Sequence, residues 1–185
     1  MNLQKNWANN IKDNKTNKLT IVLFIVYLIA LVWILIFKLG VHFSYMGNGR
    51  SMNLIPFGES VVRNGEIDFG EIIMNVVIFV PLGIYAGILF RRWITGKKLF
   101  LFFLISLIIE GFQYVFKVGA FDITDIINNT LGGIIGLMIY TGIEKIFKNS
   151  VKAQKIINII ATIGTIAMIL FLFLLKTNRL GIRYQ

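Results

Sequence analysis

A glutamate and a glutamine, Glu110 and Gln113, interrupt an otherwise apolar stretch at residues 99–118 of this 185-residue chain. The stretch is about as long as a helix needs to be to cross a bilayer. A carboxylate near its middle costs about 2.5–3.5 kcal/mol on insertion scales, so an acid at that depth indicates a functional site. The two side chains share one helical face. We therefore expect polar chemistry inside the membrane at this point.

A second group of acids and amides follows shortly after, with Asp122, Asp125, Asn128 and Asn129. Together with Gly132, the last three follow the i, i+3, i+4, i+7 spacing of one helical face and predict a polar stripe. In lipid, such a stripe must face protein or water. Asp122 by itself is equally well explained as the N-cap of the helix that follows. The asparagines also have a purely structural alternative, because amides form hydrogen bonds between membrane helices.

Glu110 is harder to explain as a structural contact, because Gln or Ser would form one without the cost of a charge. Its carboxyl group is either protonated or ionised against a cation such as Arg50 or Lys117. The sequence leaves these two states open.

The composition predicts a membrane protein. Hydrophobic residues make up 56% of the chain, charged residues make up 15%, and the mean hydropathy is +0.74. A soluble domain of this size could not bury so much apolar surface. Cysteine is absent and His42 is the single histidine, so one chain offers no disulfide and no thiolate or multi-histidine metal site. We expect no metal and no cofactor, and we assign no catalytic residue.

The net charge of +10 raises the question of a nucleic-acid partner. Lys and Arg, however, gather in the short segments between apolar runs, which is the topology signal of a bilayer protein. The sequence contains no basic helix with interleaved aromatic residues and no nucleic-acid-binding motif. We therefore expect no nucleic acid among its partners.

Five apolar runs have the length of a membrane-spanning helix. They cover residues 19–39, 71–90, 99–118, 126–147 and 156–175. The expected fold class is an all-α integral membrane protein of about five transmembrane helices, with a long outer loop between the first two. The expected regions are a basic N-terminal segment at 1–18, a four-helix membrane core at 19–147, and a fifth helix with a short basic tail at 148–185.

Basic residues also predict the orientation. Residues 1–18, 91–98 and 145–155 hold four Lys or Arg each, against seven in all of the alternate segments. Because cytoplasmic loops carry the excess, we expect a multi-pass protein of the plasma membrane with a cytoplasmic N-terminus and an outside C-terminus. This orientation brings the unusual polar residues to the outer leaflet. The expected polar pocket consists of Arg50, Asn53, Asn75, Glu110, Gln113, Asp122, Asp125 and Asn129.

The predicted outer loop adds two features to this pocket. The Arg50 guanidinium suits a phosphate or carboxylate group. The apolar residues 54–57 could dip back into the membrane interface. Two glycine pairs have the spacing that lets membrane helices approach closely, namely Gly83 with Gly87 and Gly132 with Gly136.

Three blocks of residues occur in order within about residues 25–140. They are Arg50-Ser-x-Asn53-Leu-x-Pro56-Phe57, then Asn75-Val-Val-Ile-Phe-Val-Pro81-Leu-Gly83, and then Glu110-x-x-Gln113 followed by Gly119-Ala-x-Asp122-Ile-Thr-Asp125-x-x-x-Asn129-Thr-x-Gly132-Gly133. In order and spacing, these blocks resemble the VanZ family, the membrane proteins associated with teicoplanin resistance.

The resemblance implies a Gram-positive cell-membrane protein that lowers susceptibility to teicoplanin or similar lipoglycopeptides. An enzyme-like label attached to parts of the family, phosphotransbutyrylase, finds no support, because the sequence has no nucleotide or coenzyme A loop and no nucleophile–base pair. Many family members have an arginine shortly before the Asp-Ile-x-Asp segment, where this chain has residues 119–121, Gly-Ala-Phe. A salt bridge from Asp122 to such an arginine is therefore not expected here.

Three functions are compatible with these residues. The first is non-enzymatic binding, in the outer-leaflet pocket, of a lipid-anchored envelope component such as a lipid-linked cell-wall precursor, or of the drug. The second is an intramembrane enzyme for a polyisoprenyl or phospholipid substrate, with Glu110 and Asp125 as acid and base or as oxygen ligands of a divalent cation. The third is a proton-coupled transporter, although five spans without an internal repeat do not favour an inverted-repeat architecture.

Overall fold

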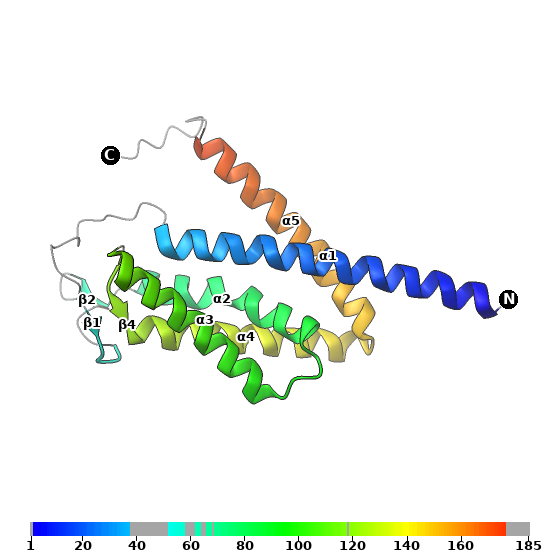
Figure 1. The fold of residues 1–185 in the computed structure, drawn as a ribbon, viewed down its shortest axis with the longest axis horizontal. Helices are drawn as coiled ribbons and strands as arrows, with labels where there is room; N and C mark the ends of the chain where they lie inside the picture. The colour runs from blue at the N-terminus through cyan, green and yellow to red at the C-terminus, as the bar shows by residue number, and fades with distance from the viewer. Residues whose placement is uncertain are drawn as a thin grey trace. The chain divides into compact units, whose positions relative to one another are not determined.

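A computed structural model describes residues 2–37, 52–57, 62–63, 66–67, 69–117 and 119–176. Five helices account for most of these residues: α1 (Asn2–Phe37), α2 (Phe69–Leu89), α3 (Thr95–Phe116), α4 (Ile123–Phe147) and α5 (Ser150–Lys176) (Figure 1). Four two-residue strands complete the described structure: β1 (Met52–Asn53), β2 (Val62–Arg63), β3 (Glu66–Ile67) and β4 (Phe121–Asp122). Of the predicted residues, Arg50 and His42 lie outside the described ones.

Each of the five helices contains a segment that is long and apolar enough to cross a membrane. These segments are Asn17–Ile34, Phe69–Leu89, Thr95–Phe116, Ile123–Phe147 and Ser150–Leu170. Large apolar residues stay exposed along these segments, as expected for helices that are surrounded by lipid. The prediction of an all-α integral membrane protein with about five transmembrane helices is confirmed.

All five helices begin earlier than their predicted apolar runs. α2 begins at Phe69 instead of residue 71, and α3 begins at Thr95 instead of residue 99. α1 extends back to Asn2, and α4 begins at Ile123 instead of residue 126. α5 begins at Ser150 instead of residue 156, because Asn149 caps it. The Asn149 Oδ1 atom accepts hydrogen bonds of 2.9 Å from the Val151 N–H and 3.0 Å from the Lys152 N–H. Such caps satisfy the first backbone donors of a helix, and hydropathy alone does not detect them.

The chain divides into two compact units, and unit 1 consists of Met1–Leu28 and Ile143–Gln185. Polar side chains join α1 to α5 within this unit. The Gln154 Nε2 atom donates to Asn17 Oδ1 at 3.0 Å and to Thr20 Oγ1 at 2.7 Å. The Thr20 hydroxyl in turn donates to Asn158 Oδ1 at 3.0 Å. These bonds align two helices in an apolar solvent, where packing alone specifies the contact only weakly.

Unit 2 covers Ile29–Gly142 and contains α2, α3 and the greater part of α4. The glycines predicted to allow close packing lie where α2 and α4 meet. A Cβ atom on Gly132 would collide with the Val76 carbonyl oxygen, and one on Gly136 would collide with the Val80 carbonyl oxygen. Only glycine permits this approach of two helix backbones. The prediction from the glycine spacing is confirmed.

Two pairs of short strands were not predicted. β1 pairs with β4 in parallel, with Met52 opposite Phe121 and Asn53 opposite Asp122, and Figure 1 shows the two strands side by side. β2 and β3 form a separate antiparallel pair. The β1–β4 pair holds the segment after the first helix against the start of α4. We call the end of unit 2 where α3 ends and α4 begins the α3–α4 end.

Candidate functional site

Ten polar side chains from five elements gather toward the α3–α4 end. Nine are buried, and Asn53 is half-buried. They are Asn53 of β1, Asn75 of α2, Ser106, Glu110 and Gln113 of α3, Asp122 of β4, and Thr124, Asp125, Asn128 and Asn129 of α4. We call this set the polar cluster.

The Glu110 carboxylate connects α3 to the start of α4. Its Oε2 atom accepts a hydrogen bond of 3.1 Å from the backbone N–H of Asp122, and the Glu110 side chain is only 1% exposed. The chain reverses between them at Lys117, the α3 C-cap, which has a left-handed φ of 56°. Because a buried N–H without an acceptor costs about 1–3 kcal/mol, Glu110 has a structural role in closing this turn. That role requires an acceptor and does not require a charge.

Asp122 organises the next contact. Its Oδ1 atom accepts a 2.7 Å hydrogen bond from the Thr124 N–H, so the predicted N-cap of α4 is confirmed. Both carboxylate oxygens also lie close to the Asn53 Nδ2 atom, at 3.4 and 3.3 Å. A side chain from the long loop therefore contacts the same acid that begins α4, which is the contact that the β1–β4 register permits.

The loop continues from Asn53 into an apolar segment, Leu54–Phe57, which we call the apolar tip. The Ile55 N–H donates to Asn53 Oδ1 at 3.3 Å, and the Phe57 N–H donates to the Thr124 hydroxyl at 3.0 Å. These bonds hold Phe57 in the left-handed region, at a φ of 56°, which is unusual for a bulky residue. The side chains of the tip are exposed. The tip thus presents apolar groups beside a buried polar cluster.

Two further bonds run between helices. The Asn75 Nδ2 atom of α2 donates to Asp125 Oδ1 of α4 at 2.6 Å, and Asn129 Nδ2 of α4 donates to Ser106 Oγ of α3 at 2.9 Å. The stripe predicted on α4 is therefore directed at the two neighbouring helices and buried, as expected for polar groups in lipid. The structural alternative for the asparagines accounts for one Asn129 bond.

This structural alternative does not account for all amide atoms of Asn128 and Asn129. Asn128 Nδ2 and Asn129 Oδ1 are buried and have no hydrogen-bond partner among the described residues. Asn128 is 3% exposed and Asn129 is 0% exposed. Buried polar atoms are nearly always paired, and each unpaired one costs about 1–3 kcal/mol. One donor and one acceptor at the centre of the stripe thus have no hydrogen-bond partner within the described residues.

The structure brings most of the predicted site residues into contact. Direct bonds join Asn53 to Asp122, Glu110 to the Asp122 backbone, and Asn75 to Asp125. Gln113 is buried on the face of Glu110 and lies against Gly119, where an added Cβ would be 3.4 Å from the Gln113 Oε1 atom.

Sequence reasoning missed two members of the cluster, Ser106 and Thr124. Ser106 lies four residues before Glu110 and seven before Gln113. That spacing places it on their helical face and could have identified it. Thr124 has no comparable signal, since its partner is a backbone N–H of the distant loop.

The chemistry of the cluster is that of hydrogen bonding. Its three carboxylates bond to different donors, and the described residues contain no group of three or more His, Cys, Asp or Glu that could hold a metal ion. The expectation that these groups share a hollow opening outward stays a prediction. A hollow of about 550 Å³ lies at the other end of unit 2, at the turn between α2 and α3.

Most of the chain matches one known family of proteins. The family model VanZ/LLP1 matches residues 24–148, which include every member of the polar cluster. Protein VanZ of Enterococcus faecium is 32% identical over 158 residues, which cover 84% of this chain and 94% of that protein. No solved structure matches the chain. The match to more than half of its residues, together with this relative, shows that the chain belongs to the VanZ/LLP1 family of membrane proteins.

Proposed function

We propose that this protein lowers the susceptibility of a Gram-positive cell to teicoplanin and related lipoglycopeptides without catalysing a reaction. In this proposal the polar cluster binds an amphiphile that has a polar head and a lipid chain. The amphiphile is a lipid-linked cell-wall precursor or the lipoglycopeptide itself. Similarity to Protein VanZ supports the cellular role, and the polar cluster supports binding.

The observation that carries the proposal is the pair of unpaired amide atoms at Asn128 and Asn129. A purely structural stripe would gain stability from apolar residues there, because replacing unsatisfied buried groups removes their desolvation cost. A buried donor and a buried acceptor without protein partners are typical of a binding site, where a hydroxyl or amide group of the ligand bonds to both. The bond from Asn129 to Ser106 orients one of these amides in advance.

The apolar tip supplies the second half of an amphiphile site. Leu54, Ile55 and Phe57 are exposed, and the Phe57 N–H is bonded to Thr124 within the cluster. A lipid chain that packs on the tip would place its head group next to Asp122 and Asn53. Arg50, three residues before Asn53 in the sequence, is the candidate for binding an anionic head group.

The proposal places the α3–α4 end at the outer face of the membrane. The support is the distribution of basic residues, which favours a cytoplasmic location for residues 1–18, 91–98 and 145–155. Lipoglycopeptides and the final lipid-linked wall precursors act at the outer face, so a binding site must open there.

Drug susceptibility in a sensitive Gram-positive host tests the proposal. We expect the protein to raise the minimum inhibitory concentration of teicoplanin more than that of vancomycin, a glycopeptide without the acyl chain. Asn128→Leu should abolish this increase while the protein stays folded, at an expression level matched by immunoblotting. Gly111→Ala is the control, because a Cβ at Gly111 meets no other atom within 4 Å. Full resistance in the Asn128→Leu variant would disprove the role of the cluster.

Binding to purified protein separates the two amphiphiles. Full-length protein in nanodiscs is titrated with a fluorescent lipid-linked wall precursor in one series and with labelled teicoplanin in another. Saturable binding of one ligand that is lost in Asn128→Leu and kept in Gly111→Ala identifies the ligand. Binding of neither, in a protein that confers resistance in cells, would contradict direct recognition by the cluster. Turnover of the precursor would favour the enzymatic alternative instead.

A further inference from the structure

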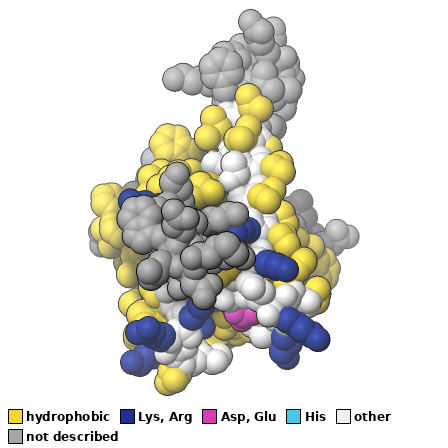
Figure 2. All heavy atoms as spheres, turned by 90° about the vertical axis from the view of Figure 1, so that its right-hand side faces the viewer, with side chains coloured by type: hydrophobic (Ala, Val, Ile, Leu, Met, Phe, Trp, Pro, Cys, Tyr) yellow, Lys and Arg dark blue, Asp and Glu magenta, His cyan; other side chains and the backbone are white. Residues whose placement is uncertain are grey.

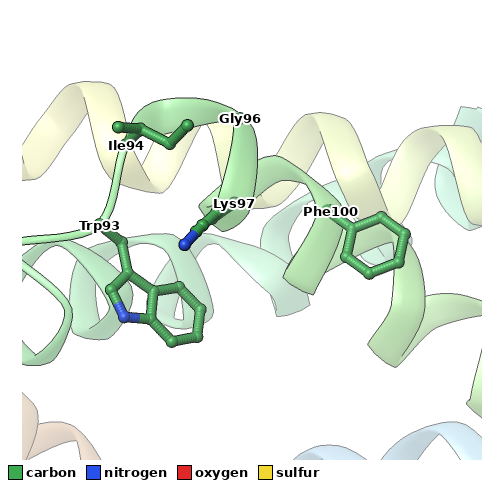
Figure 3. A pocket seen from close by; sticks show the side chains of 5 residues that line it. All are labelled: Trp93, Ile94, Gly96, Lys97 and Phe100. Carbon is green, nitrogen blue, oxygen red and sulfur yellow. The ribbon is translucent and has the colours of Figure 1, made fainter.

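A hollow lies at the turn between α2 and α3, at the end of unit 2 away from the polar cluster. The hollow of about 550 Å³ there is lined by Trp93, Ile94, Gly96, Lys97 and Phe100 (Figure 3). Its volume is within the range of about 300–1,000 Å³ that small-molecule sites occupy, and it is a shallow hollow whose lining residues are all exposed at the surface. That is enough room for a lipid head group and the adjoining part of its chains.

The charge around the hollow is strongly positive. Residues 90–98 include four Lys or Arg and no acidic residue. Lys97 lines the hollow, Arg92 directly precedes the lining residue Trp93 in the chain, and both are exposed. Figure 2 views the side of the molecule that carries this turn, and Lys and Arg side chains are prominent there while Asp and Glu are few. An anion at the hollow would therefore be attracted by at least two cations that no acid in the same turn neutralises.

The rest of the lining is apolar and aromatic. Trp93, Ile94 and Phe100 are all exposed large hydrophobic residues. Figure 3 shows the Lys97 amino group turned toward the Trp93 indole, with the Phe100 ring farther along α3. An indole beside a basic side chain is typical of the boundary between lipid tails and head groups, where one part of the ring is apolar and its N–H is polar.

Local contacts hold this arrangement in place before any ligand arrives. The Phe90 ring stacks on the Trp93 indole with the centroids 4.5 Å apart. The backbone N–H of Trp93 donates to the Phe90 carbonyl at 3.0 Å, and the backbone N–H of Lys97 donates to the Ile94 carbonyl at 3.1 Å. A binding site that is already ordered loses less conformational entropy when a ligand binds.

We propose that this hollow binds an anionic glycerophospholipid. The phosphate diester pairs with Arg92 and Lys97, and an acyl chain packs along Ile94 and Phe100, with the Trp93 indole at the level of the glycerol esters. Basic pockets between membrane helices bind anionic head groups in this way. The site is separate from the polar cluster, so it does not depend on the function proposed above.

Quenching of Trp93 fluorescence by brominated lipids tests the proposal in the full-length chain. Trp7→Phe and Trp33→Phe leave Trp93 as the single tryptophan. The protein is reconstituted in phosphatidylcholine vesicles that contain increasing amounts of brominated phosphatidylglycerol, or of brominated phosphatidylcholine as the zwitterionic comparison. We expect half-maximal quenching at a roughly tenfold lower mole fraction of the anionic lipid. Equal quenching by both lipids would overturn the proposal.

Two variants separate the hollow from general surface charge. Gly96→Leu places a bulky side chain at the hollow, and because a Cβ at Gly96 meets nothing within 4 Å, the protein can accommodate it. We expect this variant to lose the anionic preference, while Gly111→Leu, at an equally open position of the same helix, keeps it. Arg92→Gln combined with Lys97→Gln should also lose the preference, and Lys145→Gln combined with Lys148→Gln should not. An unchanged preference in Gly96→Leu would disprove binding in the hollow.

Discussion

The Glu110 carboxylate of α3 accepts a hydrogen bond from the backbone N–H of Asp122, which lies twelve positions further along the chain in β4. One side chain therefore both closes the turn between α3 and α4 and positions the acid that caps α4. Two properties of Glu110 can be separated by substitution: its capacity to accept a hydrogen bond and its capacity to carry a charge or a proton.

Substitutions at Glu110 should separate stability from function. Glu110→Gln keeps an oxygen acceptor for the Asp122 N–H, so we expect a melting temperature close to that of the parent in detergent. Glu110→Ala removes the acceptor and should lower the free energy of unfolding by about 1–3 kcal/mol. If Glu110→Gln also loses teicoplanin resistance at normal expression, the carboxyl group itself has a role in function. A Glu110→Ala protein as stable as the parent would show that the hydrogen bond contributes little.

The Asn75 side chain of α2 donates a hydrogen bond of 2.6 Å to the Asp125 carboxylate of α4. A double-mutant cycle with Asn75→Ala and Asp125→Ala measures their coupling. We expect a coupling energy of about 0.6–1.7 kcal/mol, the range found for hydrogen bonds between membrane helices. The measurement is reversible unfolding in mixed detergent micelles. Additive effects of the two substitutions would mean that the bond is not formed in solution.

Close packing of α2 on α4 predicts that alanine substitutions at Gly132 and Gly111 change the stability of the protein to very different extents. Gly132→Ala places a methyl group against the Val76 carbonyl oxygen and should destabilise the protein by about 1–3 kcal/mol. Gly111→Ala, in open space on α3, should instead be neutral or stabilising by up to about 1 kcal/mol, since Ala favours helix over Gly. Thermal unfolding of both variants under the same detergent conditions gives the comparison. Equal stability of the two would contradict the helix contact.

The absence of cysteine makes the proposed orientation directly measurable. Ile55 is 72% exposed on the apolar tip, and Ile94 is 69% exposed at the α2–α3 turn. In intact cells, we expect a membrane-impermeant maleimide to label Ile55→Cys and to leave Ile94→Cys unlabelled until the membrane is permeabilised. The reverse pattern would place the polar cluster at the cytoplasmic face and exclude a binding site for an external drug.

Local sequence patterns were sufficient to predict the elements and several site residues. Apolar runs of spanning length identified five helices, since insertion into lipid depends on the composition of each segment. The spacing of Asp125, Asn129 and Gly132 identified the buried face of α4, because lipid excludes unpaired polar groups. Asp122 was identified as a cap from its position before an apolar run. The starts of all five helices were predicted too late, because polar residues ahead of each apolar run, including the caps of α4 and α5, also belong to or begin the helix.

The tertiary structure alone decided which of these residues touch one another. No periodicity in the sequence indicates that β1 pairs with β4, that Glu110 accepts the Asp122 N–H, or that Phe57 is bonded to Thr124. It also decided that Asn129 bonds to Ser106 while Asn128 Nδ2 has no partner among the described residues. The physical reason is that these outcomes depend on distances between segments far apart in the chain, whereas burial in lipid depends on the nature of each segment by itself.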